Sequence, residues 1–235
     1  MHYFRLIDDS GPAFAVLLAL LLGTTACTDN ETSYFPLDKG RRWQYEIETN
    51  TVEGTRKQKD VVQSMGRVNN GVANLYRFRS ASGQESMVLS TGEEVGLVNQ
   101  IEPQMNLHTI FLKHPVEAEA SWESVITTST IATFDRKAGN FIEDVPVTAR
   151  VESIDETVIV PAGRFHHCLK ITATGEKLIP KGTYAYQEKM DLKIVNTRWY
   201  APGIGLIREE HEEITGVLEY PDSGYVKVLD KFSAP

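Results

Sequence analysis

Cys27 is the residue whose surroundings point most directly to a chemical role. It follows an apolar run over residues 13–23 and the small residues 24–26, a pattern typical of an export signal that ends in a lipid-modified cysteine. An apolar helix of that length extends about 16 Å, which is too short for a hydrocarbon core of about 30 Å. The pattern therefore predicts that Cys27 carries a lipid that includes palmitate, and that the mature chain has no membrane-spanning helix.

The segment departs from the usual lipoprotein signal in two places. Thr24 stands where leucine is common, and Asp8 and Asp9 accompany a single arginine, Arg5, before the apolar run. The alternative interpretation is an ordinary cleaved signal, in which Cys27 is incidental or removed.

The lipoprotein interpretation divides the chain into three parts. Residues 1–26 are the signal peptide, residues 27–33 are the lipidated cysteine and a flexible polar tether, and residues 34–235 are a single β-rich domain. In Gram-negative bacteria an aspartate directly after the lipidated cysteine tends to retain a lipoprotein in the inner membrane. Because Thr28 takes that place, we expect the protein at the periplasmic face of the outer membrane.

Metal binding is a second chemical possibility, at His166, His167 and Cys168. Alternation along a strand would place His166 and Cys168 on one face, where a soft transition metal could bind both. A structural site needs about four ligands. The sequence has no Cys-x-x-Cys pair nearby, and His108 and His114 do not have the spacing of metal ligands. We therefore expect a buried cysteine beside surface histidines, with no metal and no cofactor.

The acidic run Glu209–Glu213 contains His211 at its centre and could serve acid–base catalysis. Its side chains would alternate between the two faces of a strand, and we expect a solvated sheet edge that keeps neighbouring sheets from pairing. The sequence contains no Gly-x-Ser-x-Gly elbow, no His-Glu-x-x-His motif and no glycine loop followed by Lys-Ser or Lys-Thr. We therefore expect that the protein is not an enzyme and has no catalytic residues.

The charge balance limits the partners of the chain. The formal net charge is −8, from 24 Lys and Arg residues against 32 Asp and Glu residues. This balance argues against nucleic acid and against a polybasic attachment to anionic lipid, so the membrane would be held through Cys27 alone. Once Cys27 carries a lipid, Cys168 has no partner for an internal disulfide.

The elements that must position these residues are strands. Trp43–Ile47 alternates apolar and polar residues, and similar β-prone runs continue as far as Phe232 with turn residues between them. The step Asn70-Gly71 predicts a tight hairpin whose flanking strands pair directly. About ten to twelve strands in sequential hairpins predict an all-β fold, a strongly curved antiparallel sheet or unclosed barrel, with little helix after the signal peptide. A short turn is expected near Glu93 or Glu102.

Two tryptophans occupy equivalent positions in a weak internal sequence repeat. Pro36 precedes Trp43 at the same spacing at which Pro115 precedes Trp122. Convergence on one turn-to-strand geometry is favoured over duplication because few positions match. In either case both indoles are predicted to be core anchors.

Three blocks in sequence order resemble a known family. They are Tyr34–Tyr45, Val160–Ile171 and Trp199–Arg208, and they are similar to the TapB-like family of bacterial envelope lipoproteins. That family resembles the LolA and LolB lipoprotein carriers, in which an antiparallel sheet curls around an apolar cavity. The resemblance implies a fold more firmly than a function.

Three kinds of function follow from these expectations. The first is a non-catalytic binding module for an apolar ligand or lipid moiety, with a cavity lined by residues such as Trp43, Tyr76, Phe78 or Trp199. The second is an accessory lipoprotein that binds a partner protein in the envelope. The third is an envelope hydrolase, which would require a serine, a histidine and an acid in one cleft.

Overall fold

The computed structural model describes most of the chain after the predicted tether. The described residues are 33–51, 54–69, 74–98, 107–130, 142–180, 189–218 and 220–235. Cys27, the predicted signal peptide and Thr28 lie outside these residues, so the predictions that concern them remain predictions. The described residues belong to one compact unit.

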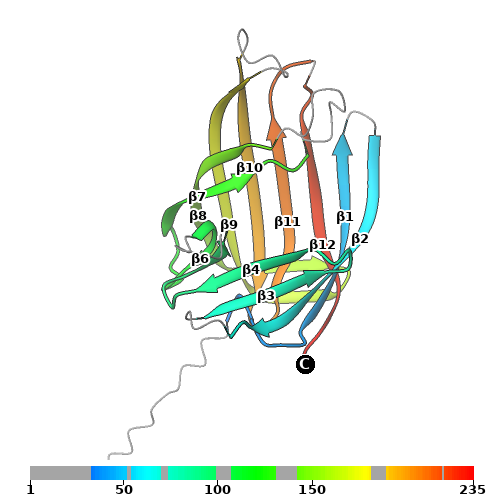
Figure 1. Ribbon diagram of the computed structural model, residues 1–235, viewed down its shortest axis with the longest axis vertical. Helices are drawn as coiled ribbons and strands as arrows, with labels where there is room; N and C mark the ends of the chain where they lie inside the picture. Colours follow the sequence, from blue (N-terminus) through cyan, green and yellow to red (C-terminus); the bar gives the residue numbers. More distant parts are fainter. Residues whose placement is uncertain are drawn as a thin grey trace, which may run out of the picture. The chain divides into compact units, whose positions relative to one another are not determined.

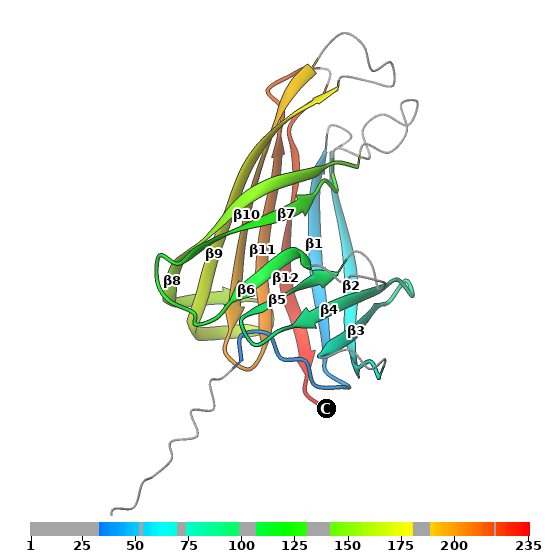
Figure 2. The same cartoon turned by 60° about the vertical axis from the view of Figure 1, so that its left-hand side comes forward.

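The described residues form strands and turns. They contain no helix, and therefore no helix that could cross a membrane. Twelve strands make one antiparallel sheet that curls into a nearly closed barrel (Figure 1, Figure 2). The strands are β1 (Arg42–Thr51), β2 (Gly54–Arg67), β3 (Leu75–Ser80), β4 (Glu85–Ser90), β5 (Glu94–Val98), β6 (Leu107–Lys113), β7 (Ser121–Thr127), β8 (Asp144–Val160), β9 (Gly163–Pro180), β10 (Lys189–Ala201), β11 (Gly205–Ile214) and β12 (Ser223–Ser233).

Strand order follows from sequential hairpins and one long-range pairing. The order across the sheet is β6-β5-β4-β3-β2-β1-β12-β11-β10-β9-β8-β7. Only the antiparallel pairing of β1 with β12 joins strands distant in sequence, with Thr49 opposite Tyr225. This pairing places β11 and β12 in the middle of the sheet and leaves β6 and β7 as its two ends.

The two ends meet at a seam that side chains bridge. The Ile110 amide donates to Ser124 Oγ at 2.9 Å, and the Thr109 hydroxyl donates to the Val125 carbonyl at 2.8 Å. The Trp122 indole donates to the Ile110 carbonyl at 3.4 Å. In the described strands no backbone ladder joins β6 to β7, so hydroxyl groups substitute for ladder hydrogen bonds there.

The core lies inside the barrel, on the inward-facing side chains of alternating positions. In β8 the residues Val145, Val147, Ala149 and Val151 are buried and their neighbours are exposed, as expected for a strand with one face on a core. Trp43 and Trp122 are both buried at the starts of β1 and β7, which confirms the prediction of core anchors.

The predicted all-β fold is confirmed, and so is the pairing of the strands around the Asn-Gly step. β2 pairs with β3, although the turn residues 70–73 themselves lie outside the described residues. β5 and β6 were not predicted: Gly96 interrupts the alternation of β5, and only a short turn was expected near Glu93 or Glu102.

Candidate functional site

A cavity of about 280 Å³ opens inside the barrel, toward the end where β1 begins and β12 ends (bottom in Figure 1). Strands β1 to β6 and β10 to β12 contribute its lining. Its apolar walls include Phe35, Trp43, Phe78, Val88, Phe111 and Leu206. Its polar lining residues are Tyr45, Ser86, Arg198, Tyr200, Glu209 and Lys227.

The aromatic walls of the cavity have their polar atoms bound to backbone. The Trp43 indole nitrogen donates to the Ile204 carbonyl at 2.6 Å, and the Tyr45 hydroxyl donates to the Leu206 carbonyl at 3.0 Å. Gly205, with a φ of 99°, lies at the β10–β11 turn, where a Cβ would be 3.3 Å from Pro36. A side chain at that position would be strained and would crowd the wall, which explains the glycine in this block. The rings therefore present apolar faces to the cavity.

The segment before β1 crosses this end of the barrel and adds Phe35 to the walls. Phe35 stacks on Phe111 with centroids 5.4 Å apart and meets Phe78 edge-on at 6.1 Å. Hydrogen bonds hold the segment, among them those from the Gly203 amide to the Ser33 carbonyl at 3.0 Å and from the Ser64 hydroxyl to the Leu37 carbonyl at 2.9 Å.

A buried ion pair forms the polar end of the cavity. Arg198 and Glu209 are register partners on β10 and β11, and Arg198 Nε donates to Glu209 Oε1 at 2.8 Å. Burial by itself raises the pKa of Glu209, but Arg198 and Lys227 together lower this pKa to about 2. Burial opposes the charge of Arg198, and Glu209 outweighs it and raises the pKa of the guanidinium. Glu209 is therefore an ionised carboxylate held within the barrel.

A second polar layer continues from this pair along β11. Asn196 Nδ2 donates to Glu209 Oε1 at 3.1 Å and to His211 Nδ1 at 3.3 Å, and His211 Nε2 lies 2.9 Å from Glu213 Oε1. Because a carboxylate only accepts hydrogen bonds, His211 Nε2 is the donor to Glu213. The His211 ring also stacks on Tyr225 at 5.1 Å.

Glu213 accepts further hydrogen bonds from the backbone after β7. The Ser129 amide donates to Glu213 Oε1 at 2.6 Å and the Thr130 amide donates to the same oxygen at 3.2 Å. The Glu213 side chain is completely buried. Amide donors and His211 therefore compensate for the removal of this carboxylate from water.

The interpretation of Glu209–Glu213 as a solvated sheet edge is wrong. β11 lies between β10 and β12, and Glu209, His211 and Glu213 are buried with exposed fractions of 6%, 2% and 0%. The predicted alternation is correct, because Glu210 and Glu212 point to the other face. What the sequence did not reveal is that the inward positions of this strand find charged and polar partners on β10, on β12 and after β7.

Side-chain contacts fix the position of His211 in this polar layer. Both ring nitrogens of His211 are engaged, one by Asn196 and the other by Glu213. Within the described part of the chain, His211 forms no hydrogen bond with a hydroxyl or a thiol. The layer thus orients side chains around the Arg198–Glu209 pair.

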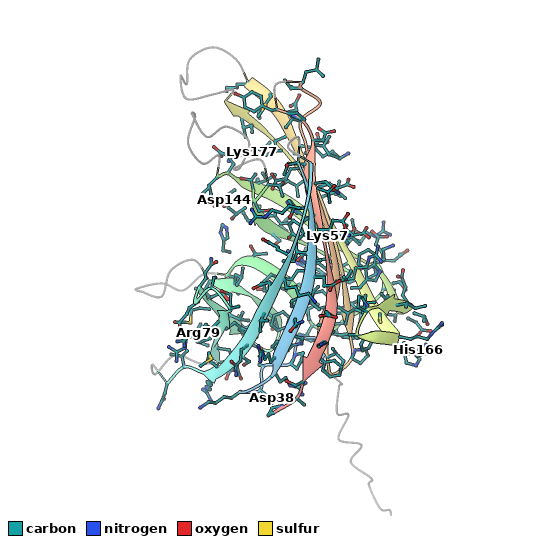
Figure 3. The ribbon with its side chains drawn as sticks, turned by 90° about the vertical axis from the view of Figure 1, so that its right-hand side faces the viewer. Asp38, Lys57, Arg79, Asp144, His166 and Lys177 are labelled. Atoms are coloured by element: carbon teal, nitrogen blue, oxygen red, sulfur yellow. The ribbon has the colours of Figure 1, made fainter. Side chains whose placement is uncertain are left out.

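The other predicted residues fall as follows. Cys168 is buried, while His166 and His167 are exposed, as expected; Figure 3 shows His166 at the outer end of the β8–β9 hairpin. The two histidines and Cys168 do not follow simple alternation, because His167 has a φ of 55°. Burial raises the pKa of the Cys168 thiol. Among the described residues no three His, Cys, Asp or Glu side chains gather as a metal site.

Of the four residues proposed to line a cavity, Trp43 and Phe78 do so. Tyr76 lies on β3 outside the lining, and Trp199 lies on the opposite face of β10, where its indole donates to Glu156 at 2.8 Å. The alternation of side chains along β10 explains why Trp199 points away from the cavity, because its neighbours Arg198 and Tyr200 face it.

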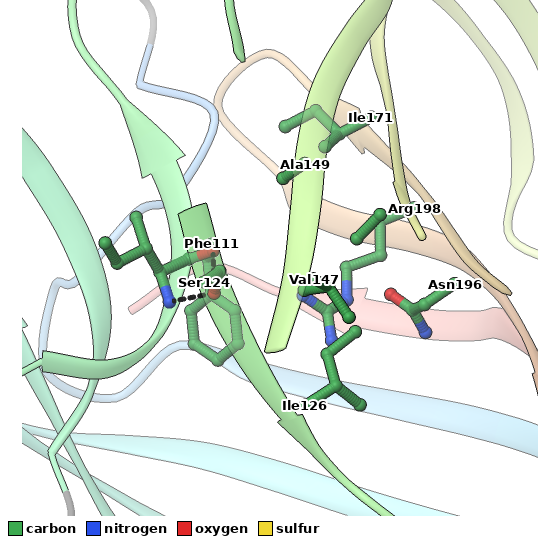
Figure 4. A pocket seen from close by; sticks show the side chains of 10 residues that line it. Phe111, Ser124, Ile126, Val147, Ala149, Ile171, Asn196 and Arg198 are labelled. Carbon is green, nitrogen blue, oxygen red and sulfur yellow. Dashed lines mark hydrogen bonds between the residues drawn. The ribbon is translucent and has the colours of Figure 1, made fainter. Parts of the chain in front are cut away.

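Sequence reasoning singled out neither Arg198 nor Lys227. Their only sequence signal is a basic residue at an inward position of a strand, and this position is known only from strand register. A small hollow of about 10 Å³ beside the cavity shares Arg198 and Phe111 with it and reaches the seam at Ser124 (Figure 4).

A second hollow, of about 520 Å³, lies over Gly224 between Asn50, Glu210 and Glu212. It is larger than the cavity, but its lining is mostly polar and includes the acidic residues Glu210, Glu212 and Asp222. We therefore take the smaller cavity, which combines apolar walls with a buried ion pair, as the candidate site.

The fold and this site define an all-β protein with a cavity inside a nearly closed barrel. The chain belongs to the DUF3108-like family, whose family model matches residues 85–219. This match spans strands β4 to β11, which include Arg198 and Glu209. No protein of curated function matches the chain.

Two solved structures are similar to the chain. One is a "putative lipoprotein" from Parabacteroides distasonis ATCC 8503, with 16% sequence identity and a TM-score of 0.44. The other is a "putative exported protein with YmcC-like fold" from Bacteroides fragilis NCTC 9343, with 16% identity and a TM-score of 0.40. Each comparison covers 85% of this chain and 98% of the other chain.

Proposed function

We propose that the barrel is a non-catalytic binding module for an apolar ligand or lipid moiety. The observation that carries the proposal is the cavity of about 280 Å³ with walls of aromatic and aliphatic side chains. Ligand pockets start at about 300 Å³, so this cavity suits a slender ligand such as a single hydrocarbon chain.

The energetics of the walls support the same proposal. Each methylene group moved from water into an apolar site contributes about 0.8 kcal/mol. Because the Trp43 and Tyr45 polar atoms are already bound to backbone carbonyls, a hydrocarbon chain would not leave them unpaired. The resemblance to TapB-like proteins and to LolA and LolB carriers, noted from the sequence, points to the same class of ligand.

The proposal includes a location. The chain would be a lipoprotein of the bacterial cell envelope, attached through lipid on Cys27, with the periplasmic face of the outer membrane favoured. An acidic domain on a short polar tether would use the lipid as its membrane attachment, because the acidic balance of the chain, −8 over its full length, opposes anionic lipid.

The experiment uses the full chain carrying Cys27→Ala, purified without detergent. Native mass spectrometry would reveal co-purifying lipid, and the neutral fluorescent probe N-phenyl-1-naphthylamine would report an apolar site. We expect Val62→Trp, which enlarges a lining residue of β2, to weaken probe binding at least about tenfold.

The matched control is Val61→Trp, one residue away on the opposite face of β2, which should retain the affinity of the parent chain. Circular dichroism and thermal unfolding would establish that both variants fold. A ligand-free mass together with no probe uptake by the parent chain would overturn the proposal. The accessory role would then be the next hypothesis to test.

A further inference from the structure

We propose that the ligand is a hydrocarbon chain with a single anionic head group, and that Lys227 binds this head group. The inference rests on the proposed function and adds to it the chemical class of the ligand. The observation behind it is the distribution of charge around the cavity.

Three charged side chains line the cavity: Arg198, Glu209 and Lys227. Arg198 and Glu209 neutralise each other in a direct ion pair at 2.8 Å. The remaining charge of the lining is the Lys227 ammonium, so the lining as a whole carries a formal charge of +1. One negative charge on a ligand would balance it.

Lys227 is placed for this role by the register of β12. It is opposite Glu209 in the β11–β12 ladder and opposite Ile47 in the β1–β12 ladder. Arg198 forms the ion pair with Glu209, and Lys227 Nζ instead lies 4.4 Å from the centre of the Tyr45 ring. Among the described residues Lys227 forms no ion pair of its own, so its ammonium can accept an anionic partner.

Asp60, Tyr45 and Tyr200 lie near this site and add no charge to the lining. Asp60 lies opposite Tyr45 in the β1–β2 ladder and raises the pKa of the Tyr45 hydroxyl, but it does not line the cavity. Burial is the first cause of that rise, and it also raises the pKa of Tyr200 to about 12. Both phenols are therefore neutral at pH 7, and neither would repel an anion.

The apolar walls and the single ammonium define the ligand together. A carboxylate or phosphate head would accept a charge-assisted hydrogen bond from Lys227 while its chain packs on Phe35, Phe78 and Phe111. A neutral head would leave the net charge of +1 of the lining unbalanced in a partly apolar site. A cationic head would add a second unbalanced positive charge.

Displacement of N-phenyl-1-naphthylamine from the full chain carrying Cys27→Ala would test the head group at pH 7. The competitors are decanoate, decyl phosphate, decanol and decylamine, which share one chain length. We expect the two anions to bind at least about tenfold more tightly than decanol, which corresponds to about 1.4 kcal/mol, and decylamine to bind most weakly. The comparison of the two anions then distinguishes a carboxylate source from a phosphate source.

Lys227→Met removes the ammonium and keeps an unbranched apolar side chain. In this variant decanoate should lose about tenfold in affinity while decanol changes less than about twofold. Lys227→Arg should retain the preference for anions. The control Lys193→Met alters an exposed position on β10 and should leave all four affinities unchanged.

The outcomes separate this inference from the proposed function. Equal displacement by decanoate and decanol in the parent chain, or tighter binding of decylamine, would overturn the head-group inference and leave an apolar site intact. If no competitor displaces the probe because the probe does not bind, the proposed function itself fails. The head-group comparison in the parent chain needs no variant, so it decides the question even if Lys227→Met does not fold.

Discussion

Replacing Glu209 by glutamine should remove a stabilisation that depends on pH. The ordinary pKa of this carboxyl is 4.5, and in the folded chain it falls to about 2 because Arg198 and Lys227 outweigh the effect of burial. At about 1.36 kcal/mol for each pKa unit, this difference corresponds to about 3 kcal/mol of stability. The side chain is only 8% exposed, so solvent screens the interaction little.

The sign of the pH dependence follows from the lowered pKa. A carboxyl whose pKa is lower in the folded state stabilises the fold fully above the unfolded pKa, and this contribution disappears as pH falls from 4.5 toward 2. We therefore expect Glu209→Gln to lower the free energy of unfolding by about 3 kcal/mol at pH 7, with about 2 kcal/mol of that deficit gone by pH 3.

Urea denaturation of the parent chain and the variant at both pH values measures this deficit. Glu210→Gln is the matched control, because Glu210 is the next residue, lies on the outward face and pairs with Arg208 in a half-exposed position. Its deficit should stay below about 1 kcal/mol at either pH. A deficit for Glu209→Gln that is equal at pH 7 and pH 3 would refute the assignment of the lowered pKa to the Arg198–Glu209 pair.

Two further predictions concern the seam and the anchor. Ser124→Ala removes the acceptor of the Ile110 amide, so it should lower the free energy of unfolding by about 1–3 kcal/mol and speed hydrogen exchange at Ile110; unchanged exchange there would show that Ser124 does not close the barrel. Labelled palmitate should enter the wild-type chain in a bacterial host and not a Cys27→Ala variant; equal labelling of both chains would contradict lipidation at Cys27.

Much of the fold could be predicted because it rests on local pattern. Alternating residues such as those of β8 and β10 identify strands, and short turns between them require antiparallel neighbours. The buried tryptophans could be predicted for the same reason, since each begins a strand with an apolar inward face. β5 was not predicted because it is only five residues long and Gly96 interrupts its pattern, and nothing in the structure explains why β6 was missed.

The candidate site could be predicted only in part. Trp43 and Phe78 were expected in a cavity and line it, whereas Trp199 was expected there and faces the other side of β10. The charged residues of the site were missed or misread, because the burial of Glu209 is stabilised by Arg198, which lies on another strand.

The sequence by itself determined that this chain is an all-β domain of sequential hairpins, because side-chain alternation and turn residues act over a few positions. The tertiary structure decided which strands are central, through the pairing of β1 with β12. β11 pairs with both β10 and β12, so an acidic segment expected at an edge is interior, and its carboxylates meet Arg198 and the backbone amides of Ser129 and Thr130. Burial of a charge depends on partners supplied by distant parts of the chain, and local pattern alone does not reveal them.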